Sequence, residues 1–401
     1  MDDLYKPVII QNQIQVIPKL FTAIIALLVT CGMGNAQNNK SLTHVVEEAA
    51  DWTALFNRNS GWFGGDGVFA IPLDGRDNQT ADSVTETMII FSDTMLGEIE
   101  NKRIKPGHSM VHNSVAYFRG VEPKEDKIKF HWKQDKSGKP SSLFTPQTVS
   151  SQEGDYYWLG DGFLNRDLGN RIYIFAYRMR TMDKNDDWSF KEMGTDLIVL
   201  PSGSTPPFED QRQIESPLRF EDGGFGAGIF VNTVYSGAPN PDGFIYVYGV
   251  RGRDKKLMVA RVLPLDFENF DAWRFWDGKG WNKDMDQVAY VADGVSNELS
   301  VTALEDGKYA LIFTLNGINP EVGLRLAESP LGPFGPVQVI YEAQEMKQKN
   351  YITYNAKAHP HLSVPGELLI SYNVNAFDFG NEIQAHPNLY RPRFIKIKFS
   401  Q

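Results

Sequence analysis

The chain alternates between turn-forming residues and short apolar segments rich in aromatic residues. Five times, a turn containing glycine or asparagine is associated with a segment of mainly β-branched and aromatic residues. This pattern is typical of β-strands that follow hairpin turns. The five segments are T-M-I-I-F-S (87–92), R-I-Y-I-F-A-Y-R (171–178), F-I-Y-V-Y-G-V (244–250), K-Y-A-L-I-F-T-L (308–315) and E-L-L-I-S-Y-N-V (367–374).

Each of these segments is flanked by two further apolar segments. Those before the turn are residues 67–73, 161–165, 228–235, 298–304 and 359–364. Those after it are residues 113–118, 195–200, 257–262, 323–328 and 394–399. The five copies recur about every 73 residues, and radial repetition of such meanders is typical of a β-propeller. We therefore predict an all-β fold, a five-bladed β-propeller over residues 61–401, with a large β-sandwich as the alternative.

The segment before the first repeat has apolar residues at the spacing of a helix, unlike the strand-like repeats that follow it. Residues 37–60 are predicted to form a short helical segment that packs against the propeller, with the helix over residues 41–58. Its apolar stripe would consist of Val45, Ala49, Trp52, Leu55 and Phe56.

The first 36 residues are predicted to be a signal peptide. The apolar run L-F-T-A-I-I-A-L-L-V-T-C is followed by G-N-A-Q, which suits cleavage after Ala36. The run is shorter than the roughly 20 residues of a membrane span, so we expect no membrane span in the mature chain. The protein would be exported: periplasmic, at the cell surface or secreted. A lipoprotein anchored through Cys31, the only cysteine, is the alternative.

The charge balance excludes one broad class of partner. The net charge is −10 and no dense basic segment occurs. Because nucleic-acid affinity depends mainly on Lys and Arg that neutralise phosphates, we expect no nucleic-acid partner.

Carboxylic acids lie near the beginning of the first strand of several repeats. Asp66, Asp161 and Glu298 lie there, as does the pair Glu221/Asp222. The first strands of a propeller line its central channel, so these side chains would meet in one funnel. Grouped carboxyl groups with unequal pKa values can protonate a leaving oxygen and activate water at a glycosidic bond.

The chain resembles a known family at two motifs of its first repeat, G-G-D-G (64–67) and F-S-D-T (91–94). It is similar to the five-bladed β-propeller glycoside hydrolases that include arabinanases, xylosidases and fructosidases. It resembles more closely a group of secreted bacterial propeller domains, some of which degrade arabinan. Residues 246–262, 273–278 and 368–375 also look like that group.

The resemblance implies roles for individual carboxyl groups. Asp66 would be the base or nucleophile, and Asp161 would tune the pKa of its partner and orient it. The family's acid usually comes from the third blade, where this chain has F-G-A-G-I-F-V-N without a carboxylate. Glu298 of the fourth repeat is better placed, so we predict Asp66, Asp161 and Glu298 as the catalytic set.

Five further residues are predicted to bind substrate. Aromatic faces stack on sugar rings, and histidine and aspartate can bond sugar hydroxyls. These residues are Asp93, His112, His359, Trp62 and Trp158. We expect no cofactor and no bound metal at this site. A structural cation in the channel is compatible with the sequence.

The most direct interpretation is a glycoside hydrolase that acts on a poly- or oligosaccharide. A non-catalytic carbohydrate-binding propeller of the cell surface or periplasm is the alternative. A third interpretation, an interaction propeller without a sugar ligand, predicts a channel lined by apolar or small residues.

Overall fold

The structure is a computed structural model that describes residues 44–183, 188–348 and 350–399. All of them belong to one compact unit, Leu42–Gln401. The predicted signal peptide, with Cys31 and the cleavage position after Ala36, lies outside the described residues.

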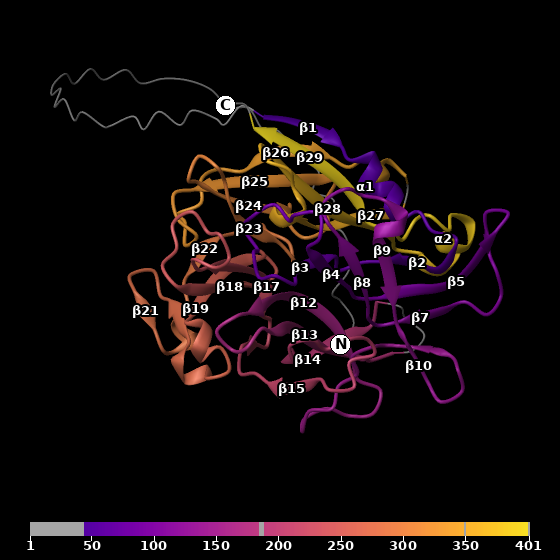
Figure 1. Ribbon diagram of the computed structural model, residues 1–401, viewed down its shortest axis with the longest axis horizontal. Coiled ribbons are helices and arrows are strands. Elements are labelled where there is room, and N and C mark those ends of the chain that lie inside the picture. Colours follow the sequence, from indigo (N-terminus) through magenta and orange to yellow (C-terminus); the bar gives the residue numbers. More distant parts are fainter. Residues whose placement is uncertain (1–43, 184–187, 349, 400–401) are drawn as a thin grey trace, which may run out of the picture. The chain divides into compact units, whose positions relative to one another are not determined.

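Five antiparallel sheets, each built around a four-strand meander, make up most of this unit (Figure 1). Each takes its strands from consecutive parts of the chain, apart from one N-terminal strand in the last sheet. In chain order, the first sheet contains β3 (Phe69–Pro72), β4 (Glu86–Phe91), β8 (Ser114–Arg119) and β9 (Ile128–His131), and the second contains β12 (Tyr156–Asn165), β13 (Arg171–Thr181), β14 (Phe190–Leu200) and β15 (Arg212–Glu215). The third sheet contains β17 (Gly223–Asn232), β18 (Phe244–Arg251), β19 (Lys256–Val262) and β20 (Arg274–Trp276), and the fourth contains β23 (Ser300–Ala303), β24 (Tyr309–Thr314), β25 (Glu321–Ala327) and β26 (Gln338–Glu342). The fifth sheet contains β27 (Tyr351–Ala358), β28 (Glu367–Ala376), β29 (Arg393–Phe399) and β1 (His44–Glu48).

The remaining elements extend these sheets or connect them. The third sheet continues through short strands, and a small sheet forms beside the first. The short strands are β16 (Arg219–Phe220), β21 (Trp281–Asn282), β22 (Tyr290–Ala292), β2 (Ser60–Gly65), β5 (Thr94–Glu100), β6 (Arg103–Ile104), β7 (Ser109–Val111), β10 (Lys133–Gln134) and β11 (Pro140–Ser141). The α-helices among the described residues are α1 (Ala50–Leu55) and α2 (Phe379–Ala385), and neither is long and apolar enough to cross a membrane.

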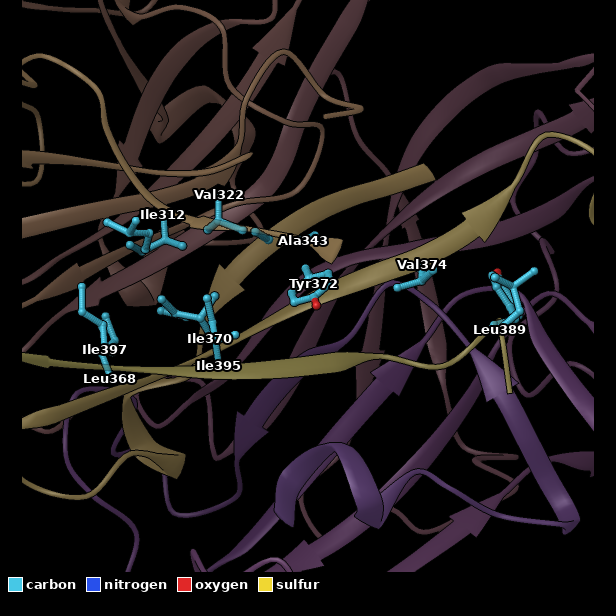
Figure 2. Close-up of a cluster of buried hydrophobic side chains, with 14 of the residues drawn as sticks. Ile312, Val322, Ala343, Leu368, Ile370, Tyr372, Val374, Leu389, Ile395 and Ile397 are labelled. Atoms are coloured by element: carbon cyan, nitrogen blue, oxygen red, sulfur yellow. The ribbon is translucent and has the colours of Figure 1, made fainter. Parts of the chain in front are cut away.

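The hydrophobic core lies between neighbouring sheets. Alternate residues of a strand point to opposite faces, so each strand serves two core clusters. In β13, Tyr173 and Phe175 pack toward the third sheet, whereas Ile172 and Ile174 pack toward the first. Further clusters join the third sheet to the fourth, the fourth to the fifth and the fifth to the first, so the sheets form a closed succession. Figure 2 shows part of the cluster between the fourth and fifth sheets, with Ile312 and Ile370 among its members.

This closed succession confirms the predicted all-β propeller fold. The first strands β3, β12, β17 and β23 lie side by side near the middle of the unit (Figure 1). The five turn glycines that marked the repeats, Gly75, Gly169, Gly243, Gly307 and Gly366, all have φ between 69 and 86°, a region in which other residues are strained. The turn pattern thus predicted the repeat correctly.

Two local predictions are wrong. The predicted helix over residues 41–58 is a strand followed by a short helix, because β1 pairs with the edge of β29 and completes the last sheet. The first strand of the fifth sheet is β27, which lies before the predicted segment 359–364. That segment contains a single 3₁₀ turn, Pro360–Leu362, because Pro360 cannot donate to a strand ladder.

Candidate functional site

Asp66 lies in the connection between β2 and β3, where the backbone is tightly held. The N–H of Gly65 donates to the Tyr390 carbonyl (2.9 Å), and the N–H of Ser92 donates to the Asp66 carbonyl (2.9 Å). Gly67 has φ +64°, and a Cβ there would lie 2.7 Å from Ser92 Oγ, so only glycine fits. The two glycines around Asp66 therefore fix the direction of its side chain.

The Asp66 side chain is partly exposed and lies near other acids. Burial and the nearby charges of Asp93 and Glu298 raise its pKa to about 7. Tyr354 of β27 donates its hydroxyl to Asp66 Oδ2 at 2.6 Å, which partly offsets this rise. The raised pKa thus favours the protonated form of this carboxyl group.

Asp161 lies at a β-bulge between Leu159 and Gly162 in β12. The bulge turns the carboxylate toward the third sheet, where it accepts the Ile229 N–H at 2.7 Å as well as the Gly162 N–H at 2.8 Å. Burial raises the pKa of Asp161 to about 7, although both backbone donors and Lys357 act in the opposite direction. Two backbone donors leave this side chain little rotational freedom.

Glu298 connects the two aspartates electrostatically. Its charge contributes to the raised pKa of both Asp66 and Asp161. The residue is 9% exposed, and its Oε2 accepts a short hydrogen bond from the ammonium group of Lys357, whose side chain is 1% exposed. The Lys357 nitrogen also lies 4.3 Å from the centre of the Phe69 ring. Glu298, just before the fourth sheet, therefore links Asp66 beside the first sheet with Asp161 in the second, and the three form the carboxylate cluster.

Asp93 and His112 form a second layer beside Asp66. His112 Nδ1 lies 2.8 Å from Asp93 Oδ1, and the imidazole stacks on Tyr156 with ring centres 3.8 Å apart. Asp93 raises the pKa of Asp66 by its charge, and both Asp93 and His112 remain partly exposed. These two predicted binding residues border the carboxylate cluster.

The other predicted binding residues are placed less uniformly. Trp158 is partly exposed and packs its ring edge-on against Phe190 at 4.7 Å. Trp62 is 1% exposed and stacks on Phe130 at 4.6 Å in the core, so its predicted position at a sugar site is wrong. The sequence around a tryptophan next to glycines does not distinguish a side chain in the core from one at a ligand site.

His359 also occupies a different environment from the one predicted. It is 3% exposed, its Nε2 lies 2.7 Å from Ser371 Oγ, and burial lowers its pKa well below the usual value. His361 is buried as well, with its pKa lowered to about 3. Because the segment is a 3₁₀ turn and not a strand, both neutral histidines line the same cavity.

That cavity has a volume of about 50 Å³ and is bordered by all five first strands or the residues next to them. Its polar lining includes Asp77, Asp161, Lys357, His359 and His361. Burial raises the pKa of Asp77 to about 7, and Asp77 Oδ2 has no hydrogen-bond partner among the described residues. This polar lining disagrees with the interaction-module interpretation, which required an apolar channel.

Metal ligands do not gather in the part of the chain that the structure describes. Within it, no group of three or more His, Cys, Asp or Glu side chains is arranged to hold a metal ion.

Three tyrosines border the cluster, and their roles were not predicted from the sequence. Tyr354 bonds Asp66, the charge of Asp66 helps to raise the pKa of Tyr390, and the charges of Glu298 and Asp161 help to raise that of Tyr177. Tyr354 and Tyr177 lie in strands and Tyr390 lies in the connection between α2 and β29, and composition did not separate any of them from core tyrosines.

Comparison with known proteins identifies the family. The family model described as "Domain of unknown function (DUF5005)" matches residues 49–399. The chain belongs to this family. No curated protein sequence matches the chain.

This DUF5005 member is similar to several solved structures, at a level that concerns the fold alone. A hydrolase candidate from Bacteroides ovatus has a TM-score of 0.67 and 19% identity, covering 90% of this chain and 92% of that one. An endo-arabinase from Bacteroides thetaiotaomicron has a TM-score of 0.41 and 13% identity, with 83% and 97% covered. An exo-β-1,3-galactanase from Phanerochaete chrysosporium has a TM-score of 0.45 and 10% identity, with 84% and 62% covered. The TM-score of 0.67 shows that this chain shares its fold with the Bacteroides ovatus protein.

Proposed function

We propose that the protein is an exported glycoside hydrolase that cleaves a poly- or oligosaccharide with Asp66, Asp161 and Glu298. The observation that carries the proposal is the set of three interacting carboxyl groups from separate sheets, two of them with pKa values raised to about 7. Glycosidic cleavage needs one protonated and one ionised carboxyl group at the same pH. An isolated surface carboxylate would not supply the protonated form.

The contacts favour particular roles. Asp66, with its raised pKa, suits the acid that protonates the leaving oxygen. Glu298 receives a hydrogen bond from the Lys357 ammonium group, which favours a carboxylate able to activate water or attack the anomeric carbon. Asp161, fixed by two backbone donors, suits the positioning of its neighbours. This assignment exchanges the roles of Asp66 and Glu298 that the family resemblance implies.

Two substrates distinguish an acid from a base or nucleophile. Asp66→Asn is expected to lose activity on arabinan, arabinoxylan or galactan but to retain it on a dinitrophenyl glycoside, whose leaving group needs no proton. Glu298→Gln is expected to lose both activities. The control is Glu153→Gln, an exposed carboxylate with no role in the cluster.

Each alternative predicts its own result. If Asp66→Asn fails on both substrates while Glu298→Gln keeps the activated one, the roles are reversed and follow the family resemblance. If the wild type binds these polysaccharides without cleaving any glycoside, the protein is a carbohydrate-binding propeller. The absence of a carboxylate from β17 is the observation that favours carbohydrate binding without catalysis as a second candidate function.

A further inference from the structure

Aromatic side chains continue outward from the carboxylate cluster in an unbroken series. Tyr156, which stacks on His112, lies 6.0 Å from Trp158, and Trp158 lies 4.7 Å from Phe190. Phe190 lies 6.4 Å from Trp188, and Trp188 lies 5.9 Å from Phe377 (all ring centres). We call these five residues, Tyr156, Trp158, Phe190, Trp188 and Phe377, the aromatic track.

The track connects two sheets that are not neighbours. Trp188 lies just before β14 in the second sheet, whereas Phe377 follows β28 in the fifth. The indole N–H of Trp188 donates to the Phe377 carbonyl at 3.0 Å, which holds these two segments together. The first sheet lies between them in the succession and supplies Asp93 and His112, so the track passes beside the cluster.

The outer end of the track is exposed although it is strongly apolar. Trp188 is 40% exposed and Phe377 is 57% exposed. Tyr156, Trp158 and Phe190 are each partly exposed. Contiguous exposed aromatic side chains beside a polar site are characteristic of a binding surface, because a core would bury them. Their geometry suits flat apolar faces such as those of sugar rings, whose rims carry the hydroxyl groups.

The charges near the track restrict the ligand. Asp66, Asp93 and Glu192 are acidic, and the nearby cations Arg219 and Lys357 already pair with Glu192 and Glu298. An acidic polysaccharide would be repelled by the carboxylates of Asp66 and Asp93 and by the net charge of −10. A neutral glycan would not.

We propose that the aromatic track binds successive sugar units of an extended neutral glycan and leads this chain into the carboxylate cluster. This inference rests on the proposed function for the identity of the ligand and adds its length and charge. Short substrates that occupy only the cluster would not use Trp188 or Phe377, whereas polysaccharides would.

The test is affinity electrophoresis in gels containing debranched arabinan, arabinoxylan, galactan or, as the acidic probe, polygalacturonate. Wild type should be retarded by at least one neutral polymer and not by polygalacturonate. Trp188→Ala and Phe377→Ala should each weaken that retardation about five- to tenfold, the size expected for one lost aromatic contact. Trp188→Phe, which keeps a ring but loses the N–H, should retain most of it. Tyr235→Ala is the control, since Tyr235 is 61% exposed beside Arg166 and away from the track.

The results separate this inference from the proposed function. Retention of neutral polymers that depends on Trp188, without any hydrolysis, supports the track and overturns the hydrolase. Hydrolysis of a neutral polymer with unchanged retardation and kcat/KM in Trp188→Ala and Phe377→Ala overturns the track and leaves the hydrolase. Preferential retention by polygalacturonate, or by none of the polymers, also overturns the track.

Discussion

The buried ion pair between Glu298 and Lys357 makes a strong prediction about stability. The Lys357 side chain is 1% exposed and that of Glu298 is 12% exposed, so neither charge can be solvated if its partner is removed. Lys357→Met should therefore reduce the free energy of unfolding by about 3–5 kcal/mol. Glu298→Gln should cost a comparable amount, since the ammonium group would remain over Phe69.

The double variant tests the reasoning. Replacing both residues removes both charges, so the loss should be smaller than the sum of the single losses by about 2 kcal/mol or more. Equilibrium urea unfolding at pH 7 measures all four proteins. Lys398 and Glu47 form a matched control at the surface, where the side chains are 42% and 53% exposed and the coupling should stay below about 1 kcal/mol. Additive losses for the buried pair, or a loss below 1 kcal/mol in Lys357→Met, would refute the argument.

Three further predictions concern pH and processing. If Asp66 is the acid, cleavage of an unactivated glycoside should decline as pH rises through about 7, and Asp93→Asn should move this decline to lower pH because a charge that raises the Asp66 pKa is gone; an unmoved limb in the pH profile of kcat/KM would contradict this. Asp77 has a folded pKa of about 7 against 3.8, so its contribution to stability is present below pH 3.8 and is lost as pH rises to 7; Asp77→Asn should remove that loss and stabilise the fold at pH 8 by on the order of 2 kcal/mol, with no gain at pH 4, as measured by urea unfolding at the two pH values. If the predicted signal peptide is cleaved after Ala36, the mature protein should begin at Gln37, and mass spectrometry of the N-terminal peptide that finds a lipidated Cys31 instead would decide for the lipoprotein.

The repeat was predictable because its signals are local. A glycine with positive φ followed by alternating aromatic and β-branched residues marks each hairpin, and the core clusters between sheets use that same alternation. The start of the last sheet was not predictable in this way. β1 forms a strand because it pairs with the edge of β29, more than 340 residues later in the chain. The spacing of apolar residues within a segment gives no information about such a distant partner.

The sequence could predict which acids belong to the candidate site but not how buried they are or how their pKa values are shifted. Asp66, Asp161 and Glu298 were recognised because they precede or begin the first strands. Their pKa values depend on burial and on charges from other repeats, which no single segment contains. Trp62 shows the opposite failure: it was predicted to contact sugar, yet the chain around it packs closely, since a Cβ at Gly64 would lie 2.4 Å from the Tyr390 carbonyl oxygen.

Two glycines of β17 leave no room for a carboxylate at their positions in the third sheet. A Cβ at Gly226, where φ is +110°, would lie 2.6 Å from the Phe175 ring, and a Cβ at Gly228 would lie 2.8 Å from the Leu299 carbonyl oxygen. No side chain, and hence no carboxylate, fits at those positions while the neighbouring strands stay so close. Glu298 lies next to Leu299, on the other side of that close approach, and is held by Lys357. The close packing of β17 against its neighbours thus accounts for the absence of a carboxylate at Gly226 and Gly228.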